Sequence, residues 1–323
     1  MLGLFSSLAL LWPLLFGTGG TTATLEQVFA FAAFAMSYDL LIGYTGIISF
    51  GHAMFFGTGA YVVAIALARG NGHTMSFLFG FGLAVVGAVV LSLLVAFISL
   101  RIRNAYFAMI TLAVGQVFAV MAGSQGLRQW THGNDGLTFS VPNWLNGDLT
   151  LYYLCLFFLF LTAVFLTRFV ASPVGQVLRG IRENESRAVG LGLGVVQFKT
   201  LAFVVSGVTA TLAGGVYALA QSFVSTGVYD VSGISLNVLL MVVIGGVGTL
   251  YGGVLGAAVL VGVQNLFSNW SGWPILTQHE MLWFGILYIL IVRFLPQGIL
   301  GSVVARGGVV SWRALPRFKK SQT

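Results

Sequence analysis

The chain has 323 residues, of which 58% are hydrophobic and only 7% are charged, and its formal net charge is +7. Soluble domains contain about 25% charged residues, so this composition excludes an ordinary soluble enzyme or binding module. The basic residues flank apolar runs, as on the cytoplasmic side of membrane proteins, and this argues against a nucleic-acid-binding protein.

Apolar runs suited to membrane helices recur along the whole sequence. A helix needs about 20 apolar residues to cross the hydrocarbon core of a bilayer. We therefore expect an all-α integral membrane protein with about ten transmembrane helices. The alternative is a smaller count with a re-entrant segment. The runs are 4–18, 25–43, 47–68, 75–100, 105–123, 151–167, 199–222, 233–244, 251–268 and 281–295.

The first run predicts a retained helix, broken or tilted at Pro13, because no basic residue precedes it as a secretory signal would require. Basic clusters follow at Arg101/Arg103, Arg168–Lys199 and Arg293–Lys320. Placing these clusters in the cytoplasm leaves both termini cytoplasmic. Loop 124–150, with Arg128 against Asp135, and the acidic residue Asp230 then fall outside.

Two glycine-rich segments, 42–51 and 244–253, share the same glycine spacing. Gly43, Gly46 and Gly51 correspond to Gly245, Gly248 and Gly253. Paired glycine-interrupted helices in the two halves of a transporter indicate its translocation path, although a chance match in a glycine-rich chain is the alternative. Non-helical backbone at membrane depth is tolerated only against protein or a water-filled cavity.

Few ionisable groups lie inside the apolar runs, and each is costly to bury in lipid. Asp39 precedes the first glycine segment and His52 follows it directly. Asp39 is either a path residue or a side chain that reaches the cytoplasmic interface. His52 is either near the path or a packed, hydrogen-bonded histidine. The candidate path residues are Asp39, Gly43, Gly46, Ser49, Gly51, His52, Gly245, Gly248 and Gly253.

The loop 171–199 is the one sizeable polar segment on the cytoplasmic side. Ser172 and Pro173 form a favourable helix start. Apolar residues then recur at helical spacing, which predicts one amphipathic helix over 172–188 that lies against the membrane or a partner.

Sequence signatures of an enzyme are missing. The only lysines are Lys199, Lys319 and Lys320, and no G-x-x-x-x-G-K-[ST] phosphate loop occurs. The single cysteine, Cys155, precludes a disulfide within the chain. We expect no catalytic residues, no metal site and no cofactor, and energy for transport that comes from outside the chain.

Three segments resemble the membrane permeases of branched-chain amino acid ABC importers, most closely the LivM-type subunit. They are 37–61, 180–203 and 241–257. The resemblance implies a permease domain over 1–300 and a basic cytoplasmic tail over 301–323. It makes the loop 171–199 a coupling segment to separate ATP-binding subunits. The residues implied in coupling are Arg179, Arg182, Glu183, Asn184, Glu185 and Arg187.

The resemblance further implies partners in a bacterial cytoplasmic (inner) membrane. They are a second related permease, two ATP-binding subunits and an extracytoplasmic solute-binding protein that delivers the amino acid. Alternating access past the glycine segments is the implied mechanism. The alternatives are a permease for urea, short amides or another small solute of the same superfamily, and a stand-alone channel or secondary carrier.

Overall fold

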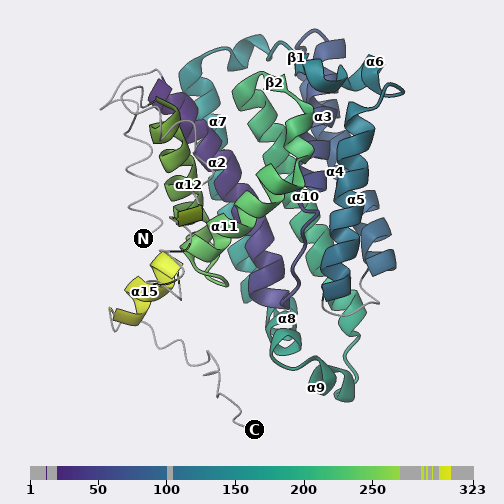
Figure 1. The fold of residues 1–323 in the computed structure, drawn as a ribbon, viewed down its shortest axis with the longest axis vertical. Helices are drawn as coiled ribbons and strands as arrows, with labels where there is room; N and C mark the ends of the chain where they lie inside the picture. The colour runs from purple at the N-terminus through teal and green to yellow at the C-terminus, as the bar shows by residue number, and fades with distance from the viewer. Residues whose placement is uncertain are drawn as a thin grey trace.

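The computed structural model describes residues 20–99, 105–269 and 298–306 and a few isolated positions. These residues form a helical bundle with one short strand pair (Figure 1). The longer helices are α2 (Gly20–Asp39), α3 (Ala53–Arg69), α4 (Thr74–Ser99), α5 (Ala105–Gly123), α7 (Asp148–Ala171), α10 (Val195–Gln221), α11 (Leu236–Gly245) and α12 (Tyr251–Asn269).

Shorter elements connect these helices. They are the π-helices η1 (Leu40–Thr45) and η5 (Val231–Ser235), the 3-10 helices η2 (Gly133–Asp135), η3 (Asn143–Leu145) and η4 (Thr226–Tyr229), the strands β1 (Leu137–Thr138) and β2 (Phe223–Val224), and the helices α6 (Arg128–Thr131), α8 (Pro173–Glu183), α9 (Glu185–Gly190) and α15 (Gly298–Arg306). The two strands pair antiparallel, with Leu137 opposite Val224. They lie at one end of the bundle, the β1 end, and α8 and α9 lie at the other, the α8 end (Figure 1).

Five described helical segments are long and apolar enough to cross a membrane: Gly20–Thr45, Thr74–Ser99, Tyr106–Gly123, Asp148–Ala171 and Val195–Gln221. Three shorter apolar helices accompany them: Ala53–Arg69, Val231–Gly245 and Tyr251–Leu266. The structure thus agrees with an all-α membrane protein. The predicted runs 4–18 and 281–295 lie almost entirely outside the described residues, so the count of about ten crossings stays a prediction.

Helix α2 lies at the centre of the bundle. In its most apolar stretch 89% of the residues are buried, against 28% for α4 and for α5. A helix that is apolar on all sides is buried by its neighbours. Small residues bring α3 and α10 close together, because a Cβ on Gly59 would overlap the carbonyl oxygen of Thr211 and one on Gly214 would overlap that of Phe56.

The structure differs from the sequence prediction in two apolar runs. The run 47–68 becomes a helix only at Ala53, and residues 46–52 climb from the end of α2 back into the bundle (Figure 1). The run 233–244 begins within the π-helix η5. Both helices therefore start inside the bundle, where the first amides of each need acceptors from elsewhere in the protein.

Asp230 lies deeper than the predicted external loop. The ring of its neighbour Tyr229 stacks on Tyr61 of α3, with 5.6 Å between the ring centroids. Tyr61 precedes the end of α3 at Arg69 by about 12 Å, at 1.5 Å of rise per residue. Asp230 therefore lies beside the body of α3, because the chain enters the bundle again after β2.

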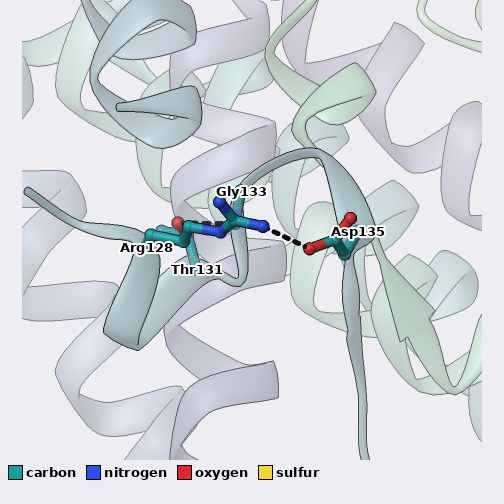
Figure 2. Close-up of polar contacts among 4 residues, drawn as sticks. All are labelled: Arg128, Thr131, Gly133 and Asp135. Atoms are coloured by element: carbon teal, nitrogen blue, oxygen red, sulfur yellow. Dashed lines mark hydrogen bonds and ion pairs between the residues drawn. The ribbon is translucent and has the colours of Figure 1, made fainter. Parts of the chain in front are cut away.

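The loop at the β1 end contains the predicted ion pair. Arg128 Nη2 lies 2.9 Å from Asp135 Oδ2, and the two side chains point toward one another across the turn (Figure 2). Thr131 Oγ1 accepts the N–H of Gly133 at 3.2 Å and donates to the Ala122 carbonyl at 2.8 Å. Both charged side chains are well exposed, so the pair contributes little to stability.

At the α8 end, the predicted amphipathic helix forms but is shorter than expected. Ser172 Oγ accepts the N–H of Gly175 at 3.4 Å, and Pro173 occupies the first turn. Leu178 and Ile181 are buried. The helix ends at Glu183, because Asn184 is extended and its Oδ1 caps α9 by accepting the N–H of Arg187 at 2.9 Å. The single helix over 172–188 was therefore a wrong prediction.

Candidate functional site at the two glycine breaks

The first glycine segment interrupts a membrane-spanning helix. The π-helix η1 continues α2, and it ends where Gly46 adopts a left-handed conformation with φ of 74°. Thr45 Oγ1 donates to the Leu41 carbonyl at 2.7 Å, and the same carbonyl accepts the backbone N–H of Gly46. Glycine suits this position because a left-handed backbone is strained for residues with a Cβ.

The second glycine segment forms the turn between α11 and α12. Gly246 (φ 118°), Gly248 (φ 83°) and Leu250 (φ 50°) all have positive φ. Gly46 and Gly248, which correspond in the sequence match, share this conformation. Figure 1 shows α2 and α11 both descending toward the α8 end, so the two breaks lie at the same end of the bundle.

Asp39 joins the two breaks. Its side chain is fully buried. Oδ1 accepts the N–H of Gly248 at 2.7 Å and Oδ2 accepts the N–H of Leu250 at 2.8 Å. The side chain therefore does not reach the protein surface at the α8 end. Asp39 instead binds backbone amides that the helix break leaves unpaired, which is a strong, charge-assisted type of hydrogen bond.

The two glycine segments also touch directly. A Cβ on Gly43 would lie 2.7 Å from the Cα and N atoms of Gly248. Tyr44 donates its hydroxyl to the Gly248 carbonyl at 2.9 Å. We call this contact between η1 and the turn 246–250 the glycine junction.

Helix α8 reaches the glycine junction through two arginines. Arg182 Nη1 donates to the carbonyl of Gly43, and it would lie 3.4 Å from a Cβ on Gly248. The Arg179 guanidinium lies 5.1 Å from the centroid of the Tyr44 ring, within reach of a cation–π contact. Helix α8 and both glycine breaks thus meet at one point.

The other predicted coupling residues lie away from the junction. Glu183 and Arg187 are exposed. Asn184 caps α9, as described above, and Glu185 Oε2 lies 3.0 Å from Lys199 Nζ, which ties α9 to α10. Among the six predicted coupling residues, Arg179 and Arg182 are therefore the two that contact the glycine junction.

His52 is a packed histidine at the start of α3. Its ring is fully buried and stacks on Phe34, with 5.5 Å between centroids. Its Nε2 lies 3.3 Å from Ser206 Oγ and 3.5 Å from Ser37 Oγ. Ser235 of η5 accepts the N–H of Ala53 at 2.9 Å and so caps α3 from another segment.

The remaining path candidates are buried in helix contacts. Ser49 has no exposed surface. A Cβ on Gly51 would overlap the Thr111 carbonyl oxygen of α5, and one on Gly245 would overlap that of Gly252. A Cβ on Gly253 would lie 3.1 Å from the Met36 amide of α2. These glycines allow close approach of backbones.

A groove of about 360 Å³ runs between α5 and η4. Gln116, Thr226 and Asp230 supply its polar lining, and Ala119 and Val120 are apolar. Asp230 accepts the N–H groups of Ser232 and Gly233, both at 3.0 Å, and so caps η5. Within the described residues, no group of three His, Cys, Asp or Glu side chains could hold a metal ion.

Comparison with known proteins assigns the family. The model of the family described as branched-chain amino acid transport system / permease component matches residues 20–292. The chain belongs to this permease family. The predicted resemblance is confirmed, and both glycine breaks and α8 lie inside the matched residues.

Named relatives agree with the family model. The permease is 27% identical to the high-affinity branched-chain amino acid transport system permease protein LivM of Escherichia coli, over 91% of this chain and 72% of the relative. Against LivM of Salmonella typhimurium the identity is 26% with the same coverage. It is 26% identical to the permease protein BraD of Pseudomonas aeruginosa over 84% of this chain and 91% of that protein. No solved structure matches the chain.

Three contributors to the site, Tyr44, Leu250 and Ser235, are absent from the sequence prediction. Tyr44 lies inside the first glycine segment, and an aromatic residue between two glycines could have indicated a contact at the break. Leu250 contributes only its amide, and Ser235 is distant in sequence from the helix that it caps. No sequence pattern indicates either of these two roles.

Proposed function

We propose that the permease is a transmembrane subunit of an ATP-driven (ABC) importer for branched-chain or other small apolar amino acids. Family membership supports the transport role. The contact of α8 with both glycine breaks through Arg182 supports the coupling to ATP-binding subunits. A stand-alone channel or carrier would have no use for a helix that reaches from the surface to the breaks.

Coupling would run from separate ATP-binding subunits through α8. The loop 171–199 is the segment on which two such subunits would act, with Glu183 and Arg187 exposed for contact. Charges of this kind set the register and orientation of a docked partner more than its affinity. Movement of α8 would then reach η1 and the turn 246–250 and switch access between the two sides of the membrane.

The path would pass the two glycine breaks. The full candidate set remains Asp39, Gly43, Gly46, Ser49, Gly51, His52, Gly245, Gly248 and Gly253, with Tyr44 added by the geometry. A small apolar amino acid needs small residues and backbone dipoles along its way, which glycine breaks supply. A second, related permease would complete the path, and a solute-binding protein would deliver substrate at the β1 end.

The orientation follows from the basic clusters and the proposed partners. The α8 end would face the cytoplasm of a bacterial inner membrane, with both termini on the same side. Residues 1–300 would form the permease domain and residues 301–323 a basic tail. The distribution of Lys and Arg supports this placement.

The test is nucleotide dependence. The permease is purified with its genomic neighbours, reconstituted in vesicles, and followed for labelled leucine uptake with and without ATP. We expect uptake that requires both ATP and an added solute-binding protein. Leucine uptake indifferent to ATP would point to a channel or carrier. If a binding protein stimulates ATPase activity but leucine is not taken up, the chain is still an importer subunit. Its substrate is then urea, a short amide or another small solute.

A further inference from the structure

The charges at the glycine junction suggest how α8 controls it. We propose that Asp39 is a charge-dependent latch between the two glycine breaks and that Arg182 of α8 holds this latch closed. The proposal rests on the proposed function and deepens it, because it names two positioning residues for the transport cycle. Neither is a catalytic residue, since both act through the position of the turn 246–250.

The latch depends on the negative charge of Asp39. A fully buried carboxylate is unfavourable unless hydrogen bonds and a nearby positive charge compensate it. Two amides, from Gly248 and Leu250, bind its two oxygens. Both amides belong to a turn with positive φ values, an arrangement whose N–H groups converge on an anion. The carboxylate thus holds this turn against η1.

Arg182 supplies the positive charge. Its guanidinium donates to the Gly43 carbonyl next to the junction, and it interacts electrostatically with Asp39. The residue as a whole remains exposed on the surface of α8. One side chain therefore stabilises the buried anion and lies within reach of a partner that docks on α8.

Displacement of α8 would open the latch. Once Arg182 leaves the Gly43 carbonyl, the carboxylate is held by two amides alone in a low-dielectric site, where an unbalanced charge is costly. Separation of the turn 246–250 from η1 relieves that cost by admitting water. The hairpin of α11 and α12 then parts from α2 at the α8 end, and the path opens on that side.

This coupling predicts non-additive substitutions. Asp39→Asn removes the charge and one of the two acceptors, so the junction loosens and no longer responds to Arg182. Arg182→Gln should therefore loosen the junction when Asp39 is present and have no further effect when Asn replaces it. Independent structural defects at two sites would add instead.

The experiment measures access to a residue behind the junction. Ser49→Cys is nearly isosteric at a fully buried position. A membrane-impermeant methanethiosulfonate reagent is applied from the α8 side to the full complex in inside-out vesicles. The native Cys155 is kept as a reporter of unfolding, because it is also fully buried in the folded chain. Arg168→Gln and Asp148→Asn, at exposed positions, are the matched controls.

We expect Arg182→Gln and Asp39→Asn each to raise the labelling rate of Ser49→Cys about tenfold, the effect of one charge-assisted hydrogen bond. The double variant should label no faster than Asp39→Asn alone. The two controls should match the parent, and Cys155 should stay unlabelled. Tyr44→Phe is a milder second variant that loses only the bond to the Gly248 carbonyl, and it should raise labelling about threefold.

Unchanged labelling in Arg182→Gln, or a double variant whose effect is the product of the two single effects, would overturn the latch. Labelling of Cys155 would show that a variant unfolds. The labelling rate of Ser49→Cys in the milder variant Tyr44→Phe then decides whether the junction controls access. The outcome is separable from that of the proposed function, because labelling needs no transport. If uptake depends on ATP but the substitutions leave labelling unchanged, the latch proposal fails and the proposed function stands.

Discussion

At the scale of single residues, the important glycines allow two backbone segments to come into contact. The Gly43 backbone meets the Gly248 backbone because neither residue has a Cβ. Other glycines carry no such constraint: Gly87 in α4 has no atom within 4 Å of an added Cβ. Composition alone therefore does not identify the glycines that the fold requires. The close contacts between backbones identify them.

Replacing Gly43 by Ala should destabilise the permease. The added Cβ would lie 2.7 Å from backbone atoms of Gly248, which cannot move without shifting α11 and α12. Overpacking of this kind costs about 1–3 kcal/mol. The thermal unfolding midpoint of the purified complex measures it, with Gly87→Ala as the control that should leave the midpoint unchanged or raise it. Equal midpoints for the two variants would contradict the close contact.

Ser235→Ala should also lower stability, by a different mechanism. The Ser235 hydroxyl oxygen accepts the Ala53 N–H at the buried start of α3. Loss of the acceptor leaves a buried donor unsatisfied, which costs about 1–3 kcal/mol. Ser232→Ala, in the same π-helix but exposed, is the control with little expected effect. The same unfolding measurement compares the two, and a larger loss in Ser232→Ala would contradict the assigned cap.

At the scale of elements, the segment after α7 consists of two helices with separate tasks. Helix α8 is anchored by Leu178 and Ile181 and reaches the glycine junction, whereas α9 is tied to α10 by the ion pair of Glu185 and Lys199. Asn184 separates them with its extended backbone. The backbone of Asn184 therefore ends α8, and its side chain caps the start of α9.

Asn184→Ala should fray α9 and leave α8 intact. The variant loses the side-chain acceptor for the Arg187 N–H, and loss of such a cap costs about 0.5–2 kcal/mol. Hydrogen exchange should accelerate at the amides of residues 187–190 and stay unchanged at residues 177–181. Asn184→Asp keeps an acceptor and should protect α9 as the parent does. Faster exchange throughout both helices would show that the two helices behave as one unit.

At the scale of the whole molecule, the sequence predicted the class of fold better than its interruptions. Apolar runs located the described helices, and the shared spacing located both breaks. Where the run 47–68 becomes helical could not be predicted, because Ser235 satisfies that helix start from a position 182 residues away. Asp230 directly precedes η5 as an ordinary N-cap, a local signal that the sequence did offer. By contrast, the partner of Asp39 lies across the fold, and apolar periodicity carries no information on such pairs.

The depth of Asp230 gives a prediction for the assembled transporter. Gln116, Thr226 and Asp230 line a groove on the surface of this one subunit, beside the body of α3. Polar groups at membrane depth do not face lipid, and face protein or water instead. The outward surface of α4, where Val86 and Val90 are 60% and 53% exposed, has no such group and suits lipid.

Nitroxide labels distinguish the two surfaces by power saturation in the reconstituted complex. If water fills the groove, a label at Gln116→Cys should be accessible to a polar nickel reagent. If the second permease covers the groove, the label should be shielded from both the nickel reagent and oxygen. A label at Val90→Cys should be accessible to oxygen alone, as expected in the hydrocarbon core. Oxygen accessibility at position 116 equal to that at position 90 would place the groove against lipid. That result would show that neither water nor the second permease covers the groove, and the Asp230 carboxylate would then serve only to cap η5.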